Sequence, residues 1–189
     1  MTIPTPESPR IGPIDRADAT EVQAGLLEGL GLSSDLHLFR TLVRHPGLFR
    51  AWSSFGGRLL LRSALAARDR ELVILRAAWL CRSDYEWGQH VAIGRDAGLS
   101  DDEIQRVAAA PDHESWSDWD RTLLAATDQL IGEHCVDDAT WAALAGRYDE
   151  QQLLEVTLLA GHYAMLAGML RSAGVQPETA SLPRLGTVA

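Results

Sequence analysis

The residues with the clearest capacity for chemistry lie in one stretch, RELVILRAAWLCRSDYEWGQHVAIGRDAGL, which runs from Arg70 to Leu99. Glu86 and His90 are four residues apart, and Ser83 comes three residues before Glu86, so on a helix the three side chains share one face. The same face continues through apolar or small residues, which predicts that it turns toward the protein interior. A carboxylate that holds an imidazole in one tautomer inside a dry cavity is typical of general acid and base catalysis.

Glu71 adds a second carboxylate to this region. It lies on the preceding predicted helix, and a turn near Ser83 would bring that helix back antiparallel, with Glu71 close to Glu86. Two carboxylates in an apolar site cannot both ionise cheaply, so we expect one of them to have a raised pKa and to serve as a proton donor. The alternative is a structural role, in which Glu86 and His90 only satisfy each other's hydrogen bonds in the core.

The rest of the chain predicts helices. Apolar residues recur at steps of three and four, no strand alternation of useful length occurs, and glycine-rich phosphate loops are absent. We therefore expect an all-α, single-domain bundle of about seven or eight helices over residues 18–175, between a proline-rich N-terminal arm (1–17) and a C-terminal tail (176–189). Ser34 or Asp35 is expected to cap the second helix, and Asp149 the last. The expected helical segments are 18–30, 36–44, 46–60, 68–82, 84–97, 101–110, 119–134, 138–145 and 150–173.

The last predicted helix, residues 150–173, is apolar almost all round, which indicates a central helix or one that contacts another subunit. His162 lies on it among apolar neighbours, so a plain core position is the simpler interpretation. The functional alternative is that His162 or Tyr163 lines the same pocket as His90.

Composition excludes several classes of function. The chain has 189 residues, 46% of them hydrophobic and 23% charged, as is ordinary for one soluble domain. A net charge of -9 argues against nucleic acid as a partner, and the lack of any lysine excludes a Schiff-base mechanism. We expect no membrane-spanning run and no signal peptide, hence a cytoplasmic protein. Cys81 and Cys135 have no pairing or metal-ligand spacing, and buried free thiols are expected.

The string from Arg70 to Ile104, which ends in GLSDDEI, resembles the carboxymuconolactone decarboxylase-like superfamily, which also contains the alkylhydroperoxidase D proteins. In the peroxidase branch, a Glu is followed twelve residues later by the first Cys of a Cys-x-x-Cys motif, and a His lies four residues after the second Cys. This sequence keeps the spacing but replaces both cysteines, with Glu71, Ser83, Glu86 and His90 at the four positions. The resemblance implies an alkylhydroperoxidase D-like helical fold, no cofactor, and homo-oligomers that are commonly trimers or hexamers, with sites near subunit contacts.

The first functional hypothesis is a cofactor-free acid/base enzyme. Resemblance to the decarboxylases implies a lyase that acts on a small carboxylated lactone or a related unsaturated acid. His90 would be the proton donor or base, Glu86 would orient it, and Glu71 would share or relay the proton. Arg82 or Arg76 is a candidate for binding the substrate carboxylate. The residues expected to contact the substrate are Ser83, Arg82, Tyr85, Trp87 and His162.

Other chemistries compete with this one. A thiol peroxidase would have to rely on Cys81, because Ser83 and Glu86 occupy the motif positions. A helical oligomer that binds a ligand without catalysis is a third hypothesis, favoured if side chains fill the pocket. Ser83 lacks the context of a hydrolase nucleophile and is more simply a helix cap. We expect no metal. Glu86 and His90 would need further ligands from Glu71, His162 or His134, and the spacing of the sequence does not mark any of these as a ligand.

Overall fold

A computed structural model of the chain describes residues 3–109, 111–179 and 181–188. Within these ranges the fold is all helical, as expected, with nine α-helices in place of about seven or eight and with no strand. Two short 3-10 turns, Arg16–Asp18 and Gly31–Asp35, join the first helices. The α-helices are α1 (Glu21–Glu28), α2 (His37–Leu42), α3 (Pro46–Leu61), α4 (Ala67–Leu80), α5 (Asp84–Asp96), α6 (Asp101–Arg106), α7 (Asp118–Gly132), α8 (Asp138–Ala145) and α9 (Glu150–Ala173).

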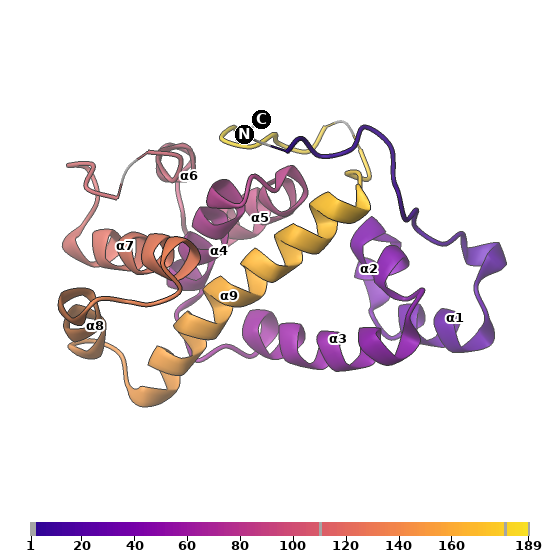
Figure 1. The fold of residues 1–189 in the computed structure, drawn as a ribbon, viewed down its shortest axis with the longest axis horizontal. Helices are drawn as coiled ribbons and strands as arrows, with labels where there is room; N and C mark the ends of the chain where they lie inside the picture. Colours follow the sequence, from indigo (N-terminus) through magenta and orange to yellow (C-terminus); the bar gives the residue numbers. More distant parts are fainter. Residues whose placement is uncertain (1–2, 110, 180, 189) are drawn as a thin grey trace.

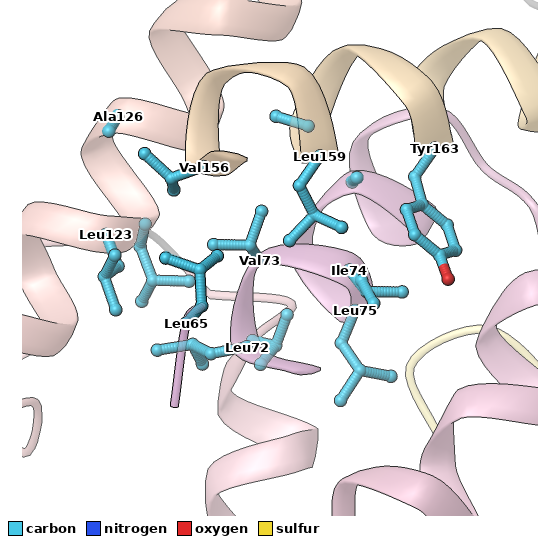
Figure 2. Close-up of a cluster of buried hydrophobic side chains, with 14 of the residues drawn as sticks. Leu65, Leu72, Val73, Ile74, Leu75, Leu123, Ala126, Val156, Leu159 and Tyr163 are labelled. Carbon is cyan, nitrogen blue, oxygen red and sulfur yellow. The ribbon is translucent and has the colours of Figure 1, made fainter. Parts of the chain in front are cut away.

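The centre of the bundle is α4, which packs against α5, α7 and α9. Most of its residues between Asp69 and Ala78 are buried. Figure 2 shows how its leucine, valine and isoleucine side chains meet those of the two neighbouring helices, and burial of this apolar surface is the main stabilising contribution. The labelled members of this cluster are Leu65, Leu72, Val73, Ile74, Leu75, Leu123, Ala126, Val156, Leu159 and Tyr163.

The long helix α9 crosses the whole molecule in Figure 1. It begins at Asp149, whose side chain accepts a hydrogen bond from the Gln152 amide while the Gln152 side chain accepts from the Asp149 amide. It ends at Gly174, which has a φ of 70°, a conformation that glycine adopts without steric cost. The bounds 150–173 and the Asp149 cap are therefore confirmed.

The cap of α2 was predicted wrongly, although its start lies within one residue of the expected one. Leu36 occupies the N-cap, and Ser34 and Asp35 lie in the preceding 3-10 turn. Their side chains bind Arg16 instead: Nη2 of Arg16 donates to Ser34 Oγ at 2.6 Å and its Nε to Asp35 Oδ1 at 3.0 Å. A partner far away in sequence has thus taken the groups that would have capped the helix.

The other helices differ from the predictions mainly at their ends. The first begins later than expected, at Glu21, because Thr20 forms a capping box with Gln23. The expected capping box of Ser100 and Glu103 is present at the start of α6. That helix ends at Arg106, and Ala110, its expected last residue, lies outside the described part of the chain.

By length and composition, α9 could cross a bilayer, contrary to the expectation that no segment would qualify. However, 56% of its apolar window is buried inside the domain. The core helix of a soluble protein, mostly buried as this one is, passes the same test of length and composition. Its outer side keeps an exposed stripe that includes Leu154, Leu158 and Met165.

The N-terminal arm and the C-terminal tail lie side by side near the end of α9 (Figure 1). The amides of Arg10 and Ile11 donate to the Ala173 carbonyl at 2.7 and 3.1 Å, and Arg171 Nη2 donates to the Ile3 carbonyl at 2.6 Å. The described part of the arm is therefore extended, as expected, and packs on its own domain. Residues 1–2 of the arm and 180 and 189 of the tail lie outside the described ranges.

Candidate functional site

A cavity of about 340 Å³ lies between α2, α3, α5 and α9. Most of its wall is apolar or aromatic, and its ionisable side chains are two histidines, one glutamate and two tyrosines. Such a volume is at the lower end of the range for small-molecule sites. The lining residues are Gly29, Leu30, Ser33, Leu36, Leu38, Phe39, Trp52, Ser53, Gly56, Gly57, Leu60, Leu61, Tyr85, Glu86, Gln89, His90, Ile93, His162, Tyr163 and Leu166.

His90 is held from behind by Glu71. Oε2 of Glu71 lies 2.7 Å from Nδ1 of His90, and its Oε1 accepts a hydrogen bond from Arg70 Nε at 2.9 Å. Burial alone would raise the pKa of Glu71, but His90 and Arg70 lower it below its usual range. With an ionised carboxylate at Nδ1, that nitrogen is the donor.

The residue that orients His90 is thus Glu71, whereas the sequence predicted Glu86 in that role. The correction follows from the α4–α5 hairpin, because the antiparallel return places Glu71 beside His90 and not beside Glu86. On the other side, the ring of His90 meets Tyr163 edge to face, with ring centroids 5.1 Å apart.

Glu86 is 2% exposed, and within the described residues neither of its oxygens has a hydrogen-bond partner. Burial raises its pKa to about 8, against a smaller opposing effect of the Ser83 side chain. The predicted raised pKa of one carboxylate is therefore confirmed, but its cause is desolvation and not a second carboxylate. At neutral pH, Glu86 is mostly protonated and can donate a proton.

His162 faces the same cavity from α9. Its ring stacks on Trp52, with centroids 5.8 Å apart and an interplanar angle of 20°. Burial lowers its pKa, so the imidazole is neutral at pH 7. Buried atoms without a hydrogen-bond partner in the described structure include His162 Nδ1, Trp52 Nε1 and Ser53 Oγ, all on residues of the cavity wall. Such groups indicate a place that a ligand or water completes.

Ser53 was not predicted from the sequence, whereas Trp52 was expected, with the other large apolar side chains of residues 46–60, to cover the pocket or to face another subunit. The available signal was the Gly56-Gly57 pair inside α3, since glycine in a helix interior is unfavourable and marks a close approach. A Cβ atom at Gly56 would lie 3.2 Å from His162 Nε2. Glycine at this position leaves room for the histidine ring.

The remaining residues expected to contact substrate are dispersed. Tyr85 lines the cavity, and its hydroxyl donates to Glu178 in the tail at 2.6 Å. Ser83 is the N-cap residue of α5 and lines a second pocket, of about 260 Å³, between the arm, the tail and α9. Trp87 is buried in the core, with its indole nitrogen donating to the Thr187 carbonyl at 2.7 Å.

Neither arginine proposed for a substrate carboxylate lines the cavity. Arg82 lies in the turn of the α4–α5 hairpin with a φ of 56°. Arg76 is buried on the far side of α4, where its Nε and Nη2 donate to the carboxylate of Asp128 at 2.6 and 2.7 Å. Arg76 therefore has a structural role in joining α4 to α7.

The two cysteines are free and differ in exposure. Cys81 is half-buried and Cys135 is exposed, so the expectation of two buried thiols was wrong for Cys135. Burial, and then the charge of Glu86, raises the pKa of Cys81 to about 11. Cys81 is not among the residues of the cavity wall. In the part of the chain that the structure describes, no group of three or more His, Cys, Asp or Glu side chains is placed to hold a metal ion.

Residues 46–129 match the carboxymuconolactone decarboxylase family. The match extends from the start of α3 through most of α7. No curated protein matches the sequence. Among solved structures, a peroxidase-related protein from Silicibacter sp. TM1040 is similar with a TM-score of 0.77 at 10% identity, over 97% of this chain and 99% of that one.

Two further solved structures are similar. An alkylhydroperoxidase AhpD core protein from Ralstonia eutropha JMP134 has a TM-score of 0.75 at 18% identity, over 89% of this chain and 93% of that one. The debrominase Bmp8, as a cysteine-to-alanine variant in complex with 2,3,4-tribromopyrrole, has a TM-score of 0.71 at 14% identity, over 92% of this chain and 94% of that one. Residues 46–129 are thus similar to the carboxymuconolactone decarboxylase family, and the fold of the chain is shared with alkylhydroperoxidase D-like proteins.

Proposed function

We propose that the protein is an enzyme that moves protons on a small organic molecule without a resident cofactor. The observation that carries the proposal is the 2.7 Å contact between Glu71 Oε2 and His90 Nδ1, on the wall of the same cavity as the protonated Glu86. An imidazole held by a carboxylate, together with a carboxyl group that keeps its proton at neutral pH, supplies the base and the acid that acid/base catalysis requires.

In this mechanism His90 and Glu86 are the catalytic residues, and Glu71 is a positioning residue. Nε2 of His90 takes a proton from the substrate, and the negative charge of Glu71 stabilises the imidazolium that forms. Glu86 gives its carboxyl proton to the carbanion or enolate. In a decarboxylation, the electron pair of the breaking carbon–carbon bond stays on carbon, carbon dioxide leaves, and the carbon takes the proton of Glu86.

The lyase branch of the superfamily suggests a carboxylated lactone or a related unsaturated acid as the substrate. A substrate of that kind would have to bind its carboxylate without an arginine, because Arg82 and Arg76 lie elsewhere. The proposal therefore rests on the proton transfer and not on this substrate class.

Thiol peroxidase chemistry is the competing proposal. It would depend on Cys81, whose pKa of about 11 keeps it a thiol at neutral pH and which lies off the cavity wall. Serine and glutamate at positions 83 and 86 cannot form the disulfide of a Cys-x-x-Cys motif. The other alternative is a helical oligomer without catalysis. A cavity filled by side chains would favour that role, and this cavity, of about 340 Å³, is not filled.

The exposed apolar surface of α3 and α9 supports a homo-oligomer. Three apolar side chains are each at least 42% exposed: Phe55 on α3, and Leu158 and Met165 on α9. Phe55 also packs edge to face on His162, which lines the cavity. Contiguous apolar surface of this kind is typical of subunit contacts. We therefore include in the proposal a trimer or hexamer, located in the cytoplasm, whose subunit contact lies next to the site.

The experiment is proton exchange from solvent deuterium into carbon acids such as butenolides, followed by NMR, together with carbon dioxide release from carboxylated lactones. We expect His90→Gln and Glu86→Gln to lower the rates by about 10²–10⁴-fold. Glu71→Gln should lower kcat more than it raises KM, because it disturbs the tautomer of His90 and not the cavity wall.

Glu150→Gln, on the exposed first turn of α9, is the matched control and should keep the wild-type rate. Equal rates in wild type, His90→Gln and Glu86→Gln would remove the proposal. Consumption of alkyl hydroperoxide with a dithiol, lost in Cys81→Ser, would establish the peroxidase in its place.

A further inference from the structure

We infer that the cavity takes its substrate as an uncharged ring compound of one or two rings that carries a hydrogen-bond-accepting oxygen. The inference deepens the proposed function and rests on it for the identity of the site. It is carried by three features of the cavity wall: its charge, its unpartnered polar atoms and its size.

The wall offers no permanent cation to a bound carboxylate. No arginine lines the cavity, and the sequence contains no lysine. The charge of Glu71 behind His90 is already balanced by Arg70, whose Nε lies 2.9 Å from it. A substrate carboxylate transferred into this apolar space would therefore have no arginine or lysine to compensate its charge.

The unpartnered atoms define what the ligand must present. The indole nitrogen of Trp52 can only donate, so it needs an acceptor such as a carbonyl, hydroxyl or ether oxygen. Ser53 Oγ, on the next residue of the same helix, can donate or accept. Protonated Glu86 can donate as well. A pure hydrocarbon would leave these groups unsatisfied, which costs binding free energy.

Size and shape favour a flat ring. A cavity of about 150 Å³ is sufficient for benzene, so about 340 Å³ has room for roughly two fused rings. The wall supplies aromatic faces, because Trp52 stacks on His162 and lies 6.0 Å from Phe39 between ring centroids. Offset or edge contacts with a flat substrate are therefore available on that side.

The test is calorimetric binding of three probes of matched shape to the wild-type protein at pH 6.5: 2-naphthol, 2-naphthoate and naphthalene. We expect 2-naphthol to bind at least tenfold more tightly than either of the others, because it is neutral and carries an oxygen. Tighter or equal binding of 2-naphthoate would overturn the inference, as would binding of naphthalene that equals that of 2-naphthol, or no binding of any probe.

Two variants sharpen the result. Trp52→Phe keeps a ring but removes the donor, so it should weaken 2-naphthol about fivefold or more and leave naphthalene unchanged. Leu60→Arg places a cation on the wall and should shift the preference toward 2-naphthoate by at least tenfold. Trp141→Phe, on the partly exposed surface of α8, is the matched control and should bind all three probes as wild type does.

These measurements read binding alone, so they separate this inference from the proposed function. If 2-naphthol is preferred but proton exchange is the same in wild type and His90→Gln, the acid/base enzyme is wrong and the inference stands. If exchange depends on His90 but 2-naphthoate is preferred, the inference is wrong and the enzyme stands.

Discussion

At the scale of single residues, one hairpin places two buried glutamates in opposite states. Glu71 has two nitrogen partners, which favour its charge, whereas Glu86 has none and is kept neutral by burial. The sequence indicated that both would be near His90, because the spacing of the three residues on the two predicted helices brings them into one region. It predicted that Glu86 would orient the imidazole, which is wrong, because the carboxylate that meets His90 depends on how α4 and α5 are rotated against each other.

Glu86 should make the stability of the protein depend on pH. Its pKa is about 8 in the folded state, compared with about 4.5 in the unfolded chain, so folding must keep a proton that the unfolded state releases. Stability should therefore fall as pH rises from about 4.5 to 8, because the unfolded state binds fewer protons in that range.

The matching substitution is Glu86→Gln, which keeps the shape and removes the titration. The variant should be more stable than wild type by a few kcal/mol at pH 9, and the difference should shrink toward pH 5. Urea denaturation at the two pH values measures it, with Glu150→Gln as the exposed control. A difference that is the same at both pH values would contradict a buried, neutral Glu86.

At the scale of elements, helix ends were predictable where the capping residue acts locally and unpredictable where it does not. Asp149 caps α9 with Gln152, three residues away, and both ends of that helix follow from the sequence. Ser34 and Asp35 bind Arg16, nearly twenty residues earlier, so the local pattern alone could not reveal that neither of them caps α2. The helical fold class depends on periodicity over whole segments and was for that reason the easiest property to predict.

The cap of α9 offers a direct stability test. Asp149→Ala removes the acceptor of the Gln152 amide and should lower the free energy of unfolding by about 1 kcal/mol. Asp149→Asn keeps an acceptor and should lose much less. Urea denaturation with an unchanged m value is the measurement. Equal loss in both variants would show that the charge, and not the hydrogen bond, stabilises this end.

At the scale of the whole molecule, α9 has two sides with different partners. One side is buried against α4 and α7, and the other carries exposed Leu154, Leu158 and Met165. The sequence showed that this helix is apolar all round, but it could not say which residues would be covered within one chain. The composition of the cavity wall could not be predicted from the sequence either, because the wall combines residues from four helices.

If the exposed side of α9 is a subunit contact, Leu158→Glu should reduce the oligomer to a monomer, because a charge in an apolar contact is costly. Light scattering after size-exclusion chromatography gives the masses. Glu150→Gln is the control and should keep the wild-type mass. A monomeric wild type, or an unchanged mass in Leu158→Glu, would contradict a contact through this surface.

The arm that packs on the end of α9 has a consequence for biosynthesis. Residues 3–11 are synthesised more than 160 residues before the groups that bind them, which are Arg171, Ala173 and Gln176. The same delay applies to the core, because α4 packs on α9. A nascent chain therefore carries an unpaired arm and an uncovered α4 until α9 has emerged, and the domain cannot complete its folding before then.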